Sequence, residues 1–442
     1  MIALLDCNNF YVSCERLFNR KLIGKPVVVL SNNDGCVISR SNEAKKLGIL
    51  MGEPFFKIKN RVKSLGIYVY SSNYSFYGDM SKRVMRTIKN YCDHVEVYSI
   101  DEAFINLEKI KECEYFCYNL KKRILKFTGI PVSIGISQTK TLSKIANKFA
   151  KDSEKNDIKI DYQGVYKINC DENLDSILKL IDIRDIWGIG KRLSIYFKEL
   201  GFNSAFDLKK MNQNFARQKK GILVQKTILE LKGMKCYEIS DNNNDKRKSI
   251  CVSRSFGQKL TKYEDIREAL VLYVQKASEK LRRYNLYCGI VNVFLKTSNY
   301  EKKYYKNSVS YVFKEPTSDS RQIWMESDKL LKSIYLRGYE FNKVGVILTD
   351  LKEKKQIQSF LFGNNDLNNK KSFEENSKLM SVMDEINRKF GEGKIRLSSD
   401  SVGRFKKAQK SKESERKWFM KSDFSSPCYT TKWCDIPFVN TN

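Results

Sequence analysis

The stretch that most constrains the fold of this chain is Val95-Glu96-Val97-Tyr98-Ser99-Ile100-Asp101-Glu102-Ala103-Phe104-Ile105-Asn106-Leu107. Two strand-like segments, Val95–Ile100 and Ala103–Leu107, flank two adjacent acids, and this pattern predicts a β-hairpin with Asp101 and Glu102 at its bend. Adjacent residues of a regular strand face opposite sides of a sheet. Both acids can therefore serve one site only where the strand turns, and the predicted bend provides such a turn.

A third acid, Asp6, directly follows an apolar segment, Met1–Leu5, that we expect to be a buried strand. Acids clustered between apolar strands resist desolvation unless cations compensate their charge. Divalent ions with oxygen ligands are the natural compensation, and two of them about 3.5–4 Å apart suit in-line phosphoryl transfer. The alternative is that Asp6 caps a turn and that Asp101 and Glu102 form a solvated hairpin tip, and the pattern alone favours neither interpretation.

Around this hairpin, strand-like and helical patterns alternate to about residue 167 and predict a mixed α/β region. The expected elements are strands Pro26–Leu30 and Val132–Ile136 and helices Ser41–Leu47, Met80–Tyr91, Tyr115–Phe127 and Thr141–Ala150. Short helices punctuated by glycine are expected from Leu174 to Tyr237.

A polar stretch without periodicity, Asp241–Lys248, predicts an exposed linker. A second compact α/β domain is expected beyond it, with strands Val252–Phe256, Gly289–Lys296 and Lys343–Leu351 and helices Tyr263–Arg283 and Ser318–Leu331. After Lys352 the chain is loop-rich, but one amphipathic helix is predicted by residues at helical spacing, namely Leu379, Val382, Ile386 and Phe390.

The overall charge points to a polyanionic partner. The 442 residues include 81 Lys and Arg against 51 Asp and Glu, a formal net charge of +30. Such an excess favours nucleic acid or an anionic membrane surface. No apolar run approaches the roughly 18–20 residues that span a bilayer, so we expect no membrane insertion. The 12 cysteines are scattered, which predicts reduced thiols in a cytosolic protein rather than a disulfide framework or a structural zinc site.

Two further motifs leave alternatives open. Phe10 and Tyr11 follow the first acid, and they are either core aromatics or rings that exclude a substrate by bulk. The segment Trp187–Lys191 carries Gly188 and Gly190, but Leu193 stands where a dinucleotide fingerprint needs its third glycine. It is either a plain helix–helix turn or a hairpin whose backbone N–H groups bind a DNA phosphate.

Taken together, the motifs resemble those of the Y-family translesion DNA polymerases of the UmuC type, the catalytic subunit of DNA polymerase V, over nearly the whole chain. The matching segments are Asp6–Tyr11 with Ser13–Glu15, Gly24–Val37, Tyr98–Phe104, Gly135–Thr141, Trp187–Gly190 and Ser253–Gly257. The resemblance implies an α/β right-hand polymerase. Its expected parts are a palm (1–23 and 76–168), fingers (24–75), a thumb with a helix-hairpin-helix (169–240), a linker (241–249), a little finger (250–352) and a C-terminal extension (353–442).

The resemblance also implies roles for individual residues. Asp6, Asp101, Glu102 and the main-chain carbonyl of Cys7 would hold two Mg²⁺ ions, and Tyr11 would be a steric gate against ribonucleotides. The residues implied to bind the dNTP are Phe10, Tyr11, Asn42, Lys45 and Lys144, although many relatives have a tyrosine and an arginine at the positions of Asn42 and Lys45. The residues implied to bind DNA are Gly188, Gly190, Lys191 and Arg254.

Partners are implied in the same way. Gln358, Leu361 and Phe362 resemble the short peptide with which such polymerases bind a sliding clamp, and Tyr429–Trp433 resembles the C-terminal extension of the family. A cleaved UmuD-type dimer and a RecA-type filament are expected as further partners, beside primer-template DNA and dNTPs, in a cytoplasmic, nucleoid-associated protein. The implied activity is error-prone synthesis across damaged bases in the SOS response. The alternatives are a DNA-bound scaffold without catalysis and a nucleotide cyclase.

Overall fold

The computed structural model describes residues 1–151, 162–169, 174–240, 247–301, 303–353, 367–391, 393–397 and 419–437, with backbone only for 367–374. The chain divides into two compact units. Unit 1 comprises 1–31, 35–244 and 424–442, and unit 2 comprises 32–34 and 245–423. Mixed helix and sheet content in both units confirms the predicted α/β class.

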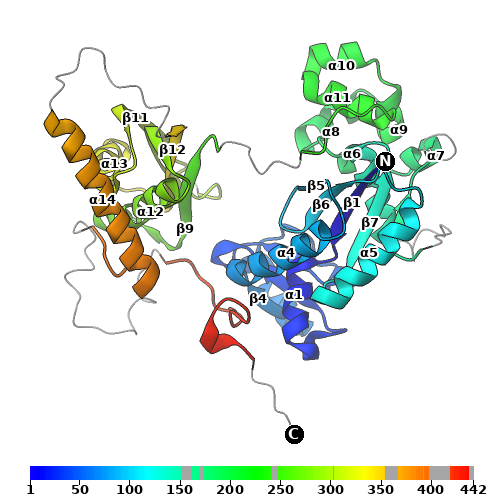
Figure 1. Cartoon of the computed structure of the whole chain (residues 1–442), viewed down its shortest axis with the longest axis horizontal. Coiled ribbons are helices and arrows are strands. Elements are labelled where there is room, and N and C mark those ends of the chain that lie inside the picture. The colour runs from blue at the N-terminus through cyan, green and yellow to red at the C-terminus, as the bar shows by residue number, and fades with distance from the viewer. Residues whose placement is uncertain are drawn as a thin grey trace, which may run out of the picture. The chain divides into compact units, whose positions relative to one another are not determined.

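Unit 1 is built on a five-stranded sheet of order β5-β6-β1-β7-β8 (Figure 1). Its strands are β1 (Ile2–Cys7), β5 (Val95–Val97), β6 (Glu102–Asn106), β7 (Val132–Ser137) and β8 (Val165–Lys167). The predicted hairpin is confirmed, since β5 and β6 pair antiparallel. The central strand β1 is apolar from Ile2 to Leu5 and buried, as a strand covered on both faces must be. Asp6 lies inside β1 rather than after it, which corrects the sequence-based prediction.

Helices cover both faces of this sheet. One face packs against α1 (Phe10–Phe18), α4 (Tyr74–Lys89) and α5 (Cys113–Thr128) in the main core of unit 1. The other face packs against α6 (Lys140–Lys151), whose contacts with β7 are very close. A Cβ at Gly135 would stand 2.1 Å from the backbone nitrogen of Asn147, so only glycine fits there. The Asn147 amide donates to the carbonyls of Leu4 and Ser133 and fixes α6 across the strands.

Two smaller substructures complete unit 1. A three-stranded sheet consists of β2 (Val27–Leu30), β3 (Val37–Arg40) and β4 (Tyr68–Ser71), and it packs with α2 (Asn42–Lys46) and α3 (Phe55–Ser64) around a separate small core. The expected short helices follow β8 and share a core with α6. They are α7 (Leu174–Lys179), α8 (Lys191–Glu199), α9 (Ala205–Lys210), α10 (Gln213–Lys220) and α11 (Ile222–Leu231).

Unit 2 is a four-stranded antiparallel sheet of order β11-β10-β12-β9. Its elements are β9 (Ile250–Leu260), α12 (Tyr263–Arg283), β10 (Leu286–Thr297), β11 (Lys306–Thr317), α13 (Ser320–Ile334) and β12 (Phe341–Glu353). Sequence reasoning did not predict β11. This edge strand is mostly exposed and contains Pro316, so it lacks the apolar alternation that marks a half-buried strand.

A long helix, α14 (Leu367–Phe390), runs beside α12 and α13 (Figure 1). The predicted helix is confirmed, but its predicted apolar stripe is wrong. Leu379, Val382 and Phe390 are each at least half exposed, and the buried side chains are Met380 and Met383. Asp384 lies at helical spacing from Met380, and it binds Arg282 of α12. This polar contact therefore belongs to the face that packs against the rest of unit 2.

Two absences were expected from composition. No described helix combines the length and the apolarity needed to cross a bilayer. Eleven cysteines lie in the described ranges, and all are free thiols.

Candidate active site

Strand register brings two of the three predicted acids together. Asp6 of β1 is directly opposite Glu102 of β6, and directly opposed residues of an antiparallel pair point to the same side of the sheet with Cβ atoms about 4.5–5.5 Å apart. The side chains are only 14% and 19% exposed. Asp101 lies in the bend before β6, and its carbonyl accepts a 2.9 Å hydrogen bond from the backbone N–H of Cys7. These acids are therefore not a solvated hairpin tip.

The hydroxyl of Ser99 organises the bend. It donates to the Asp101 carboxylate at 2.5 Å and accepts from the backbone N–H groups of Asp101 and Glu102 at 3.2 and 3.0 Å. Sequence reasoning missed this role, although a serine two residues before an aspartate at a turn is a common local hydrogen-bonding motif.

Lysines of α6 neutralise the two facing acids. The Lys144 ammonium contacts both carboxylate oxygens of Glu102 at 3.0 and 2.9 Å, and Lys151 contacts Asp6 at 2.6 Å. The two lysines are seven residues apart, which is two helical turns, so both reach the sheet from one helix face. Lys151 was not predicted, although its helical spacing from Lys144 was a usable signal.

The electrostatics of Asp6 reflect this crowding. Burial raises the pKa of Asp6 to about 6, the Lys151 ammonium opposes the rise, and the negative charges of Glu102 and Asp101 add to it. A nearby cation therefore stabilises the ionised form of the Asp6 carboxylate.

The residue types fit divalent metal binding. Within the described ranges, no three His, Cys, Asp or Glu side chains converge as a preassembled metal site. The ammonium groups of Lys144 and Lys151 supply the cationic charge next to Glu102 and Asp6 instead. Asp6, Asp101 and Glu102 are all hard oxygen donors of the kind that Mg²⁺ prefers, and the first and last share one side of the sheet.

Tyr11 lies near this cluster on α1, two residues after the left-handed Asn9 at the helix N-cap. Its ring stacks on Tyr77 of α4, with centroids 4.5 Å apart and planes 16° apart, and meets Tyr74 edge-on. Burial raises the pKa of Tyr11 to about 12, so its hydroxyl stays protonated. Phe10, in contrast, is a buried member of the core.

The predicted phosphate residues on α2 form one polar cluster. The side-chain oxygen of Asn42 accepts hydrogen bonds from Asn9 at 3.1 Å and from the Lys45 ammonium at 3.2 Å. This cluster joins the start of α2 to Asn9, the N-cap of α1, two residues before Tyr11.

The predicted glycine hairpin is a turn before α8. Gly188 has a φ of +89°, Gly190 is the N-cap of α8, and both are exposed together with Lys191, while Ile189 is buried. The indole N–H of Trp187 donates to the Tyr98 hydroxyl at 3.1 Å and ties the turn to the loop that carries Asp101.

Arg254 and a row of lysines lie on opposite faces of the unit 2 sheet. Arg254 is opposite Val344, whose side chain is buried against the helices, so strand alternation places Arg254 on the helix-covered face. On the open face, Lys306, Lys296 and Lys343 are directly opposite one another across β11, β10 and β12. We call these three residues the lysine row. Sequence reasoning missed it, because register is a property of strand pairing.

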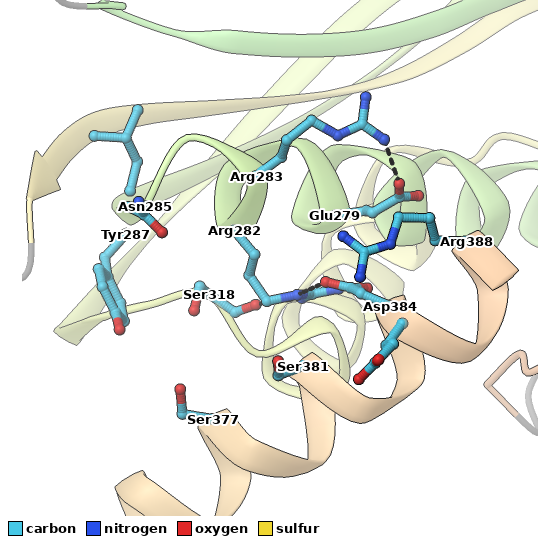
Figure 2. Close-up of a pocket in the computed structure, with 12 residues that line it drawn as sticks. Glu279, Arg282, Arg283, Asn285, Tyr287, Ser318, Ser377, Ser381, Asp384 and Arg388 are labelled. Carbon is cyan, nitrogen blue, oxygen red and sulfur yellow. Dashed lines mark hydrogen bonds and ion pairs between the residues drawn. The ribbon is translucent and has the colours of Figure 1, made fainter.

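A pocket of about 540 Å³ lies in unit 2 between α12 and α14 (Figure 2). Arg282 forms a two-point ion pair with Asp384 at 2.6 and 2.7 Å, and Arg283 pairs with Glu279 at 2.7 Å. The first pair joins α12 to α14, and the second lies within α12. In both pairs the charges offset each other, so the pocket offers no chemistry comparable to the carboxylates of unit 1. The predicted clamp residues Gln358, Leu361 and Phe362 lie outside the described residues.

Known proteins are similar to this chain over nearly its whole length. A model of the impB/mucB/samB family matches residues 5–148, a model of its C-terminal domain matches 247–361, and a domain of unknown function matches 377–439. The protein UmuC of Salmonella typhimurium is 38% identical over 99% of both chains, and ImpB of the same species is 37% identical over 99% of both. DNA polymerase IV of Picrophilus torridus is 32% identical over 63% of this chain and 77% of that protein. Among solved structures, a Y-family DNA polymerase chimera superposes with a TM-score of 0.63 at 24% identity, covering 80% of this chain and 100% of that one, which supports a shared fold.

Proposed function

Because the chain belongs to the impB/mucB/samB family and is a Y-family DNA polymerase of the UmuC type, we propose that Asp6, Asp101 and Glu102 are its catalytic carboxylates. Two Mg²⁺ ions bound by them and by the Cys7 carbonyl would activate the primer 3′-hydroxyl and neutralise the triphosphate and the leaving pyrophosphate. The single observation that carries the proposal is the register that sets Asp6 opposite Glu102.

The lysines of α6 exchange partners in this proposal. Lys144 and Lys151 neutralise Glu102 and Asp6 as long as no other cation does. If the carboxylates held metal ions, the ammonium groups of Lys144 and Lys151 would no longer be needed to neutralise Glu102 and Asp6, and they could bind the negative charge of a triphosphate. Lys45, held beside Asn42, supplies a further positive charge. The lysine side chains thus offset the charge of the carboxylates without substrate and the charge of the triphosphate with substrate.

Tyr11 excludes ribonucleotides in this proposal. A ring that is stacked on Tyr77 cannot yield toward the core, so a 2′-hydroxyl on the incoming sugar would collide with it. The uncharged phenol adds no repulsion toward a triphosphate, because its pKa is raised.

DNA is bound through phosphates. The exposed backbone at Gly188 and Gly190, with Lys191, suits a sequence-independent phosphate contact. The lysine row on the open face of the unit 2 sheet suits a second phosphate contact. Its three directly opposed cations repel one another, and a bound polyanion would relieve that repulsion. Arg254 lies on the helix-covered face of the edge strand β9. It would therefore contact only a DNA strand that passes along that edge of the sheet.

The remaining assignments follow from family membership. We assign the palm to 1–23 and 76–168, the fingers to 24–75, the thumb to 169–240, the linker to 241–249, the little finger to 250–352 and the C-terminal extension to 353–442. The proposed biological role is SOS-induced translesion synthesis in the cytoplasm at the nucleoid. The proposed partners are a sliding clamp bound by Gln358–Phe362, a cleaved UmuD-type dimer and a RecA-type filament.

The test is primer extension with Mg²⁺ on undamaged and abasic templates, with the proposed accessory proteins present. Asp101→Ala should abolish extension, whereas Asp93→Ala, which removes an exposed carboxylate outside the cluster, should leave it unchanged. Equal extension by the parent and by Asp101→Ala would remove the assigned active site, whereas no extension by the parent would leave the scaffold alternative.

A further inference from the structure

The C-terminal segment Phe424–Asp435 packs on the helices that carry the proposed sugar gate. It returns to unit 1 beside β4 and α1, where it is drawn in red in Figure 1. Ser71 and Phe424 exchange two hydrogen bonds of 3.0 Å each. The ring of Tyr429 stacks on Phe18 of α1 at 4.7 Å and meets Phe76 of α4 edge-on at 5.4 Å. This segment therefore bridges α1 and α4.

Ser426 of this segment binds a buried carboxylate. Its hydroxyl donates to Oε1 of Glu15 at 2.8 Å, and the hydroxyl of Tyr77 donates to the same oxygen at 2.6 Å. Glu15 is fully buried on α1, and its second oxygen, Oε2, has no hydrogen-bond partner among the described residues. Burial raises the pKa of Glu15, while the bonds from Tyr77 and Ser426 lower it. A buried carboxylate with so few donors depends strongly on each of them.

Tyr77 connects this carboxylate to the gate. Its side chain is fully buried, and burial raises its pKa, so the phenol remains a donor to Glu15. Tyr11 stacks on the ring that carries this hydroxyl, with centroids 4.5 Å apart. The hydrogen bond from Tyr77 to Glu15, together with core packing, thus holds the ring behind Tyr11.

Asn73 holds the same segment at the start of α4. Its amide nitrogen donates to the backbone oxygen of Ser426 at 3.2 Å, to the Ser426 hydroxyl at 3.1 Å and to the Pro427 carbonyl at 3.1 Å. Its side-chain oxygen accepts from the Phe76 N–H at 3.3 Å and caps α4. One residue therefore couples the C-terminal segment to the first turn of the helix that carries Tyr77.

We propose that Ser426 is a positioning residue for sugar selection, which acts on Tyr11 through Glu15 and Tyr77. The C-terminal segment, which lies in the domain of unknown function, would then be a structural part of the gate. The inference rests on the proposed role of Tyr11. Removing the Ser426 hydroxyl leaves Tyr77 as the one described donor to the buried Glu15 carboxylate. The carboxylate then loses its second anchor and shifts together with the Tyr77 ring, so Tyr11 can retreat from a ribose.

The experiment measures the ratio of catalytic efficiencies for a ribonucleotide and the matching deoxyribonucleotide, with the full-length chain and its proposed accessory proteins. Ser426→Ala should raise this ratio about threefold to tenfold, the range expected when part of a charge-assisted hydrogen bond is lost. Thr431→Ala removes an exposed hydroxyl from the same segment and should leave the ratio unchanged. Ser426→Thr retains the hydroxyl and should restore the parental ratio. A general folding defect lowers both efficiencies and does not move their ratio.

A double-mutant cycle tests the route. Tyr77→Phe keeps the stacked ring but removes its bond to Glu15, so it should raise the ratio as well, and the double variant with Ser426→Ala should be no worse than the larger single effect. Full additivity would overturn the route through Glu15. Tyr11→Ala, run in parallel, separates the proposed gate at Tyr11 from the proposed positioning role of Ser426. A rise with Tyr11→Ala but none with Ser426→Ala overturns this inference alone, and no rise with Tyr11→Ala removes the gate itself.

Discussion

Neutralising the lysine row should change how DNA affinity depends on salt. The perturbation is the triple replacement of Lys296, Lys306 and Lys343 by glutamine. The three side chains share the open face of one sheet, on directly opposite positions of three strands. Burial lowers the pKa of Lys343, and the nearby positive charges of Lys296 and Arg254 lower it further, while Cys251 opposes the shift.

The magnitude follows from counterion release. Each neutralised phosphate contributes about 0.9 to the slope of the logarithm of affinity against the logarithm of salt concentration. Three contacts therefore contribute about 2.7 to this slope. The ratio of the parent's DNA affinity to that of the triple variant should then fall about 40-fold between 50 and 200 mM salt. The folded variant should be at least as stable as the parent, because directly opposed like charges destabilise a sheet.

The assay is fluorescence anisotropy of a labelled primer-template titrated at several salt concentrations, with thermal unfolding as the stability readout. A matched control replaces three exposed lysines on the helix side, Lys262, Lys280 and Lys332, and changes the net charge equally. The reasoning is refuted if the slope stays at the parental value, or if the control triple lowers it by as much as the lysine-row triple does.

Three further outcomes are expected. Tyr11→Ala should raise ribonucleotide incorporation at least tenfold in primer extension, because the stacked ring no longer occupies the space of the 2′-hydroxyl. Lys151→Ala should lower kcat/KM for dNTPs about tenfold or more, whereas Lys148→Ala, which loses only an exposed pair with Asp185, should change it less than twofold in single-nucleotide kinetics. Gly135→Ala should lower the free energy of unfolding by about 1–3 kcal/mol, since the new methyl meets the Asn147 backbone, while Gly78→Ala, with open space in the middle of α4, should raise it by about 0.5–1 kcal/mol in denaturant melts.

The sequence singled out the acids because their signal is local. An acid after a strand and two acids at a hairpin bend raised the possibility that Asp6, Asp101 and Glu102 share a site, but the pattern did not decide it against a solvated hairpin tip. The exact register, with Asp6 inside β1 and opposite Glu102, required the paired strands. The sequence also predicted α12 with its observed bounds, because its helical periodicity is long and uninterrupted.

Features that depend on distant contacts were not predictable. The spacing of Lys151 from Lys144 placed both on one helix face, but only the folded chain shows its contact with Asp6. The lysine row exists only once three strands are aligned. In α14, the apolar residues at helical spacing suggested the wrong face, because the choice of face was decided by Arg282 and Asp384. Tyr77 gave no sequence signal at all, since its importance comes from two neighbours, Tyr11 and Glu15, on another helix.

The bond between Ser426 and Glu15 also has a consequence in time. The two residues are 411 positions apart in the chain. At ribosomal rates of about 5–20 residues per second, the Ser426 hydroxyl that donates to Glu15 is synthesised roughly 20–80 s after the carboxylate that accepts it. The sheet that bears Asp6 and Glu102 is made long before that moment. A nascent chain therefore acquires the proposed catalytic acids early and the last support of the proposed sugar gate late, so in this proposal selectivity matures after the means of catalysis.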